Sequence, residues 1–229
     1  IAGSHGMMGA AVLASKACIQ SGTGKLTSLI PSCGYGIMQT SLPEAMCKTG
    51  GENNITLVDH ISKYDCMGIG PGIGVLPETA AVLKNIFLKA NCPLVLDADA
   101  LNLMAADKTL LSLLPKGSVI TPHIKEFERL FGTAGNHVER LESAIKQAAA
   151  LNIYIVLKGH YTAIVTPRGK VYFNSTGNAG MARGGMGDAL TGIITGLLAQ
   201  HYALPEAALL SVYIHGLAGD IAAGKYSTY

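Results

Sequence analysis

One acidic residue, Asp188, stands inside a glycine-rich run, GNAGMARGGMGDALTGIITGLLAQ, that spans residues 177–200. Gly184, Gly185 and Gly187 allow a tight backbone turn that exposes several N–H groups. The apolar helix expected after them adds unpaired N–H donors and the positive end of its dipole, which makes an anion site. A carboxylate there is suited to take a proton from a hydroxyl that attacks a bound phosphate. The alternative interpretation is an ordinary helix start, with Asp188 as a capping or first-turn residue.

Two carboxylates, Asp97 and Asp99, follow an expected buried strand in the segment DADALN. Acids two residues apart on a strand share a face, and they repel each other unless a cation or a donor joins them. Mg²⁺, bound directly or through water, would remove that repulsion. The alternative is that Asp99 caps the next helix while Asp97 accepts backbone donors.

Two more polar clusters follow expected strands, TPHIKEFERL at 121–130 and KGHYTAIV at 158–165. In the first, His123 is placed to face a pocket, and Glu126 falls in a first helical turn, where negative charge suits the dipole. In the second, Lys158 can neutralise phosphate charge. The alternatives are a structural histidine and an exposed lysine at a hairpin corner. Ligands of such folds bind beyond the carboxyl ends of the strands, so all these clusters are candidates for one site.

The glycine loop GIGPGIG, residues 68–74, also follows an expected strand. Its spacing does not fit the dinucleotide-binding motif, because Ile73 and Val75 stand where the third glycine would be needed. A Walker loop is excluded as well, since no Gly-Lys pair in the chain is followed by Ser or Thr. We expect a loop that lets a ligand approach the backbone closely, with a plain turn as the alternative.

The composition restricts the class of protein. Of the 229 residues, 49% are hydrophobic and 14% are charged, which is typical of a folded globular chain. The net charge is +2 without a run of basic residues, so we expect no nucleic-acid partner. The five cysteines form no CxxC pair, which predicts reduced thiols in a cytoplasmic protein. We also expect no membrane partner, because Asp188 and Asp220 interrupt the best candidates for an apolar span of about 18–20 residues.

Strand-like and helix-like runs alternate along the chain, which predicts an α/β fold with a mostly parallel sheet wrapped by helices. The segment 162–173, with Pro167-Arg168-Gly169 at its centre, is expected to be a hairpin. Strands are expected at residues 25–30, 55–58, 66–69, 93–97, 118–121, 153–157, 163–166 and 171–173, and helices at 7–21, 77–90, 125–131, 138–151, 187–200 and 205–223. The opening IAGSHGMMGA has no initiator methionine and is typical of the end of a strand.

These motifs, in this order, resemble the NAD(P)H-hydrate dehydratases of the ribokinase-like superfamily. The matching segments cover almost the whole chain: GSHGMMGAA at 3–11, GIGPGIG, DADALN, TPHIKE, LKGHYT and the run at 177–200. The resemblance implies a three-layer α/β/α ribokinase-like fold with a central, mostly parallel sheet. It also implies one domain over residues 1–229 that is truncated at both ends, homotetramers, and a companion or fused NAD(P)H-hydrate epimerase.

The resemblance implies an activity too. Such enzymes phosphorylate the ring hydroxyl of the S epimer of hydrated NADH or NADPH with ADP or ATP, and loss of phosphate then restores the reduced cofactor. Asp188 would be the catalytic base, and Mg²⁺ would bridge the phosphates, with Asp97, Asp99 or Glu126 possible ligands through water. Substrate contacts would come from Ala10, Gly72, His123 and Asp188, nucleotide contacts from Lys158, Gly159, His160, Tyr161, Thr162 and Gly187, and the anion hole from Gly184, Gly185, Met186 and Gly187.

The chain departs from the family pattern at two places. Arg183 stands where a small Ser or Thr is common, and Ile124-Lys125 replaces a frequent Pro-Gly after His123. Two other functions remain open from the sequence. One is an ordinary ribokinase-superfamily kinase that makes a stable phosphate ester of a vitamin precursor or sugar, since fold alone does not define the product. The other is a non-catalytic nucleotide-binding module, against which the presence of Asp188 argues.

Overall fold

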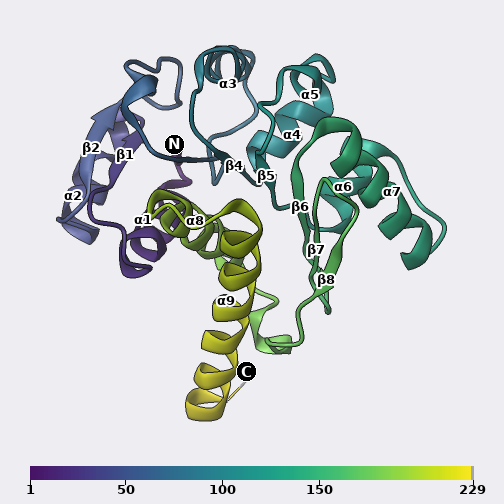
Figure 1. Ribbon diagram of the computed structural model, residues 1–229. Helices are drawn as coiled ribbons and strands as arrows, with labels where there is room; N and C mark the ends of the chain where they lie inside the picture. The colour runs from purple at the N-terminus through teal and green to yellow at the C-terminus, as the bar shows by residue number, and fades with distance from the viewer. Residues whose placement is uncertain (228–229) are drawn as a thin grey trace.

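The alternating apolar runs form helices and strands in the computed structural model, which describes residues 1–227 (Figure 1). The strands are β1 Thr27–Ile30, β2 Met46–Thr49, β3 Met67–Ile69, β4 Leu94–Leu96, β5 Val119–Ile120, β6 Tyr154–Leu157, β7 Ala163–Val165 and β8 Val171–Phe173. The α-helices are α1 Met8–Gln20, α2 Tyr35–Ser41, α3 Pro77–Lys89, α4 Asp99–Ala106, α5 Thr109–Leu113, α6 Ile124–Phe131, α7 His137–Leu151, α8 Met186–Ala199 and α9 Leu204–Tyr226. Short 3₁₀ turns lie at η1 Ser32–Gly34, η2 Ile61–Lys63 and η3 Ala179–Met181.

The central sheet has six strands in the order β3-β4-β5-β6-β7-β8. The first four strands are parallel, and β7 and β8 form the expected antiparallel hairpin at one edge. β1 and β2 make a separate parallel pair. The opening residues connect the two sheets, because the Ala2 N–H donates to the Leu29 carbonyl and the Ile1 carbonyl accepts from Gly70. The expectation of strand-like backbone at the start of the chain therefore agrees with these contacts.

Helices cover both faces of the central sheet, as Figure 1 shows. Leu94 and Leu96 of β4 pack on one side, in a core shared with α3, α4, α6 and α7. Val95, between them, faces the opposite side and packs with residues of α8 and α9. Continuously apolar strands are what a sheet buried on both faces requires. The three-layer α/β/α arrangement expected from the sequence is confirmed.

The sequence misplaced one strand near the N-terminus. Residues 55–58 were expected to form a strand, but the N–H groups of Thr56 and Leu57 both donate to the Gly50 carbonyl, so no ladder can form. Ile55 is fully buried there, and its apolar character reflects burial in a loop. The strand that pairs with β1 is instead β2, which has a partly exposed, mixed sequence and no period-2 apolar pattern.

Helix α9 is longer than expected. It runs over 23 residues and continues through Asp220, whose carboxylate accepts hydrogen bonds from the Gly177 N–H (2.8 Å) and the Asn178 side chain (3.0 Å). An 18-residue window of α9 has a mean hydropathy of 1.3, so within residues 1–227 this one helix is long and apolar enough to cross a membrane by length and composition alone. This measure tolerates charged residues in the window, whereas the sequence prediction concerned an uninterrupted apolar run, which Asp220 interrupts in α9.

Helices α1 and α8 pack closely because α8 carries glycines on the contact face. A Cβ at Gly192 would collide with the Ala14 carbonyl oxygen, and one at Gly196 with Ser21 and the Cys18 carbonyl. Gly224 in α9, by contrast, has open space around it. The close α1–α8 contact therefore requires glycine at these two positions. This contact holds α8, whose first turn contains Asp188, against α1.

We expect Gly192→Ala to destabilise the fold by about 1–3 kcal/mol, because overpacking outweighs the gain in helix propensity. The matched control, Gly224→Ala, should raise the free energy of unfolding by roughly 0.5–1 kcal/mol, since it gains propensity without a collision. Denaturant unfolding of both variants measures the difference. Equal effects of the two substitutions would contradict this account of the helix contact.

Candidate active site

The carboxyl ends of β3, β4, β5 and β6 meet at one edge of the central sheet. Ile69 pairs with Leu96, Leu96 with Ile120, and Ile120 with Ile155, so the strands end nearly level. The residues that follow them are the predicted clusters: Gly70–Gly74, Asp97–Asp99, His123–Glu126 and Lys158–Thr162. An isolated parallel bridge joins His123 to Lys158. The parallel register thus brings together four segments that are far apart in sequence.

Asp97 and Asp99 have different environments, which corrects the expectation that they share a strand face. The buried Asp97 carboxylate accepts hydrogen bonds from Lys158 Nζ (2.7 Å) and Thr191 Oγ1 (2.9 Å), so side chains and not backbone groups satisfy it. Asp99 is the first residue of α4 and makes no capping bond there. Its carboxylate instead accepts the Gly74 N–H at 2.9 Å, across to the glycine loop. Ala98 between them has a φ of +50°, a strained conformation for a residue with a side chain.

His123 and Glu126 form a capping box at the start of α6. His123 Nδ1 accepts the Glu126 N–H (3.2 Å), while the Glu126 carboxylate accepts the His123 N–H (2.8 Å). Because Nδ1 is an acceptor, a neutral His123 carries its proton on Nε2, which lies 3.5 Å from Glu126 Oε1. Burial raises the pKa of Glu126, and the Lys158 charge opposes that rise. His123 therefore has a structural role, and its half-exposed ring remains available to a ligand.

The glycine-rich run forms the loop and helix start that the sequence predicted. Gly185 is the N-cap of α8, with a φ of +92° that favours glycine. Within the part of the chain that the structure describes, the N–H groups of Gly184, Gly185, Met186, Gly187 and Asp188 donate to no protein acceptor. Asp188 lies half-buried in this first turn. Burial and the nearby Asp97 raise the pKa of Asp188, while Lys158 opposes the rise. The predicted anion hole and acid are thus adjacent.

Two predicted substrate residues from different segments lie next to each other. A Cβ at Gly72, which has a φ of +64°, would lie 3.1 Å from the Ala10 Cβ. The loop therefore approaches the start of α1 closely, and α1 also reaches the α8 loop, where Leu13 fills the space beside Gly185. At Gly70, a Cβ would collide with the Asp97 carbonyl. Packing within the protein therefore requires glycine at position 70. The prediction that the loop glycines serve close approach of a ligand does not account for this one.

The predicted nucleotide residues after Lys158 form an exposed loop. Thr162 Oγ1 donates to the Gly159 carbonyl (3.3 Å), and the rings of His160 and Tyr161 lie 4.4 Å apart, with Tyr161 65% exposed. Gly159 has open space where a Cβ would be. A Cβ at Gly187 would lie 3.1 Å from Lys158 Nζ, so the lysine joins this loop to the first turn of α8.

Three residues were missed or left unplaced from the sequence. Thr191, one turn after Asp188, bonds Asp97, and a buried threonine in an apolar helix gives no signal of that contact. His215 of α9 has a buried Nε2 without a hydrogen-bond partner in residues 1–227, and its pKa is lowered by burial and by Lys158. Arg183 is exposed on the α8 loop and pairs with no carboxylate of the described chain.

The three possible metal ligands are already engaged by protein groups. Asp97 bonds Lys158 and Thr191, Asp99 bonds Gly74, and Glu126 bonds the His123 backbone. Among residues 1–227, no three His, Cys, Asp or Glu side chains are grouped to hold a metal ion. These carboxylates thus already have protein donors, and contact with Mg²⁺ through water stays a prediction.

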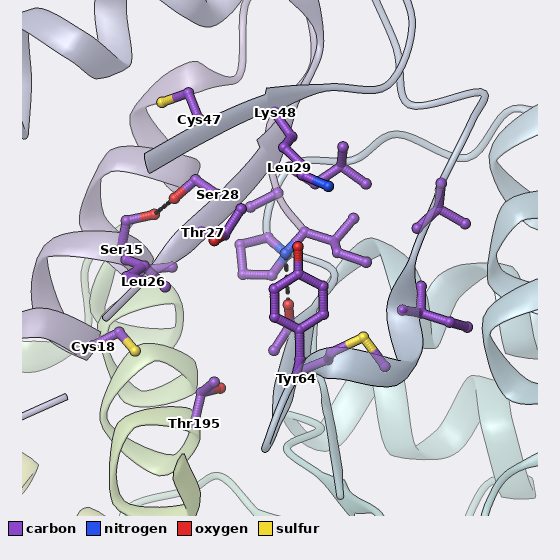
Figure 2. A pocket seen from close by; sticks show the side chains of 18 of the residues that line it. Ser15, Cys18, Leu26, Thr27, Ser28, Leu29, Cys47, Lys48, Tyr64 and Thr195 are labelled. Carbon is purple, nitrogen blue, oxygen red and sulfur yellow. Dashed lines mark hydrogen bonds between the residues drawn. The ribbon is translucent and has the colours of Figure 1, made fainter. Parts of the chain in front are cut away.

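A cavity of about 380 Å³ lies elsewhere, between β1 and β3 (Figure 2). Tyr64, Leu29 and Lys48 point into it, and Ser15 and Ser28 bond each other at its wall, 2.8 Å apart. Its lining includes Thr27 and Met67, the first residues of β1 and β3, and it includes neither Asp97, Lys158 nor Asp188. The cavity borders the polar cluster through Pro71 and Thr191, but the acids and the lysine of that cluster do not line it.

Comparison with known proteins gives the family. A family model described as NAD(P)H-hydrate dehydratase matches residues 1–229. The chain belongs to this family. The ADP-dependent (S)-NAD(P)H-hydrate dehydratase of Bacillus subtilis is 37% identical over 234 residues, which cover 100% of this chain and 82% of that protein. The bifunctional NAD(P)H-hydrate repair enzyme Nnr of Moorella thermoacetica is 39% identical over 97% of this chain. The chain spans 44% of the length of that relative and 45% of its Thermofilum pendens counterpart.

Solved structures agree with the family. The Bacillus subtilis ADP/ATP-dependent NAD(P)H-hydrate dehydratase, co-crystallised with ATP/Mg²⁺ and soaked with CoA, has a TM-score of 0.86 and 34% identity, over 100% of this chain and 83% of that one. A ribokinase-like superfamily protein of Enterococcus faecalis V583 also has a TM-score of 0.86, with 33% identity over 97% of this chain and 78% of that one. The ribokinase-like fold expected from the sequence is confirmed.

Substitution of His123 separates its capping role from substrate binding. His123→Ala should lower the free energy of unfolding by about 1 kcal/mol through loss of the cap, whereas His123→Asn should retain most of it, because Asn is a good N-cap. Both variants lose the imidazole, so both should raise the KM for a substrate that contacts this ring. Chemical denaturation and steady-state kinetics give the two values. An unchanged KM in both variants would remove His123 from the substrate site.

Proposed function

We propose that this chain is a hydro-lyase, a nucleotide-dependent dehydratase that restores NADH or NADPH from the S epimer of the hydrated cofactor. The observation that carries the proposal is the start of α8, where the N–H groups of residues 184–188 donate to no acceptor among residues 1–227 and the half-buried Asp188 is in the first turn. Family membership and the names of the Bacillus subtilis and Moorella thermoacetica relatives support the same reaction.

The geometry supports a reaction in two steps. Asp188 removes the proton from the ring hydroxyl of the hydrated cofactor as its oxygen attacks the terminal phosphoryl group of ADP or ATP. The N–H groups of Gly185, Met186 and Gly187 stabilise the transferring group, and AMP or ADP leaves. The ring nitrogen then pushes its electron pair toward the carbon that carries the phosphate, the C–O bond breaks, and phosphate departs. The neighbouring ring carbon loses a proton, which forms the ring double bond and returns the electron pair to the nitrogen. Phosphate is a far better leaving group than hydroxide, so the net result is dehydration.

Nucleotide and metal belong to the same proposal. Lys158 and the Gly159–Thr162 loop would contact the nucleotide, beside Gly187, while Ala10, Gly72 and His123 would contact the hydrated cofactor. Mg²⁺ would accompany the nucleotide phosphates and neutralise part of their charge, since the carboxylates of the site are engaged with other protein groups.

The test is product analysis of the whole chain with hydrated NADH or NADPH and either nucleotide. Restored absorbance of the reduced nicotinamide, with one phosphate released per turnover, is the expected result. Asp188→Asn should bind nucleotide normally and lose at least ~10³-fold in turnover, because the base is gone. The raised pKa of Asp188 means that it becomes protonated, and inactive as a base, at a higher pH than an ordinary aspartate.

Three outcomes would contradict the mechanism. A stable phosphate ester as product would indicate an ordinary kinase, and nucleotide binding without turnover would indicate a binding module. An Asp188→Asn variant whose turnover is within a few-fold of the parent would show that Asp188 is not the base.

The pH dependence of kcat/KM gives a further prediction. In the parent, kcat/KM should fall on acidification at a pH above the usual pKa of an aspartate, and Asp188→Asn should show no such fall.

We also propose that the chain assembles as a homotetramer. Support comes from α9, which extends from the body in Figure 1 and exposes Tyr213, Ile214, Leu217 and Ile221. Light scattering after size exclusion should give about four times the chain mass of 23.7 kDa. Ile221→Glu should lower that mass, and Lys225→Glu, an exposed polar position on the same helix, should leave it unchanged. A monomeric parent would contradict the proposal.

The remaining partners are proposals of the same kind. We propose a cytoplasmic protein, since all five cysteines are free thiols. We also propose that an epimerase supplies the S epimer, in a companion or a fused domain, because the Moorella thermoacetica relative is named a bifunctional repair enzyme and is more than twice the length matched here. Neither nucleic acid nor a membrane is a proposed partner.

A further inference from the structure

The Asp97 carboxylate connects three elements that carry the site. It is 1% exposed at the end of β4, and one oxygen lies 2.7 Å from Lys158 Nζ at the end of β6. The other oxygen accepts the Thr191 hydroxyl of α8 at 2.9 Å. Both oxygens therefore have strong protein donors, and neither donor is adjacent to Asp97 in sequence.

The first turn of α8 rests on this ion pair. A Cβ at Gly187 would lie 3.1 Å from Lys158 Nζ and 3.3 Å from Asp97 Oδ2, so both charged groups lie on the side of Gly187 where a side chain would be. Thr191 bonds the same carboxylate one turn further along. Asp188 lies between these two points of contact. Asp97 is therefore near the helix backbone just before Asp188 and hydrogen-bonded to the helix one turn after it.

Lys158 has other carboxylates within electrostatic reach. Its charge acts on both Asp188 and Glu126, and its backbone is held by the hydrogen bond from its N–H to the Pro122 carbonyl (2.8 Å). A flexible ammonium released from Asp97 would pair with one of these acids. Pairing with Asp188 would occupy the oxygen that has to accept the substrate proton.

We propose that Asp97 is a positioning residue that holds Lys158 and Thr191, and through them the first turn of α8, so that Asp188 remains free to act as the base. This role rests on the proposed function. Asp97 does not touch the substrate: it acts through the lysine and the threonine. The pair also places the one ammonium of this cluster beside Gly187, where the phosphoryl group would be transferred.

Kinetics of matched variants of the whole chain test the role. Asp97→Asn should lower kcat by about 100-fold, the scale expected for a misplaced catalytic group, with each KM within about threefold of the parent. Thr191→Val should lower kcat by about tenfold, and Thr191→Ser, which keeps the hydroxyl, should restore it. The control is Thr195→Val, one turn further on the same helix, because Thr195 donates to the Thr191 carbonyl and not to Asp97.

Hydrogen exchange gives a readout that does not depend on turnover. The Ala189 N–H donates to the Gly185 carbonyl at 3.0 Å and is the first hydrogen-bonded amide of α8. This amide and those of the next helical turn should exchange at least about tenfold faster in Asp97→Asn and Thr191→Val than in Thr195→Val, because only the first two lose the anchor. If Asp97→Asn does not fold, the three threonine variants still decide the question. A parent chain that produces no NADH or NADPH would refute the proposed function and leave the exchange result intact.

Three results would overturn the role of Asp97. The first is a kcat of Asp97→Asn within threefold of the parent. The second is recovery of that variant at high Mg²⁺, which would make Asp97 a metal ligand. The third is an equal loss in Thr191→Val and Thr195→Val, in kinetics or in exchange, which would indicate only general packing of the helix.

Discussion

The parallel register of four adjacent strands is the constraint on which the rest of the molecule depends. Because β3, β4, β5 and β6 end nearly level, the residue after each strand arrives at the same edge of the sheet. Helix α8 packs on the face of the sheet formed by Val95, Val119 and Val156, and its N-terminus lies at the edge where the strands end. The glycines of α8 allow α1 to pack closely against it. The positive end of a helix thus faces the polar ends of the strands.

Several acidic side chains gather at that edge of the sheet. Asp97 pairs with the Lys158 ammonium, whose charge also acts on Glu126 and Asp188. Burial raises the pKa of both Glu126 and Asp188. Burying these charges costs free energy of desolvation. Removal of one partner from a buried ion pair is a separate effect and typically costs about 3–5 kcal/mol. Strain adds to this cost at Ala98. Such features are common where an acid must stay poised for proton transfer.

The sequence predicted the parts of the fold that have a regular pattern. Continuous apolar runs such as LVL gave central strands buried on both faces, and the turn at Pro167-Arg168-Gly169 gave the hairpin. The sequence prediction failed where a strand lacks the regular pattern or where an apolar residue lies outside a strand. β2 has no alternation of apolar and polar residues, and the apolar Ile55 is buried in a loop. Helix α9 was expected at residues 205–223, through Asp220, and it ends three residues later, at Tyr226. The hydrogen bonds of Asp220 with the Gly177–Asn178 segment are contacts that no local rule could supply.

The candidate site divides in the same way. The sequence alone determined the glycine loop before α8, the acid in its first turn, and the polar clusters that end the strands, because these depend on local backbone geometry and helix capping. Only the tertiary structure decided how the acids differ. Asp97 meets a lysine 61 residues away and a threonine 94 residues away, whereas Asp99 meets the glycine loop. The partners of a buried charge are selected by packing across the sheet, and the spacing of residues along the chain does not encode them.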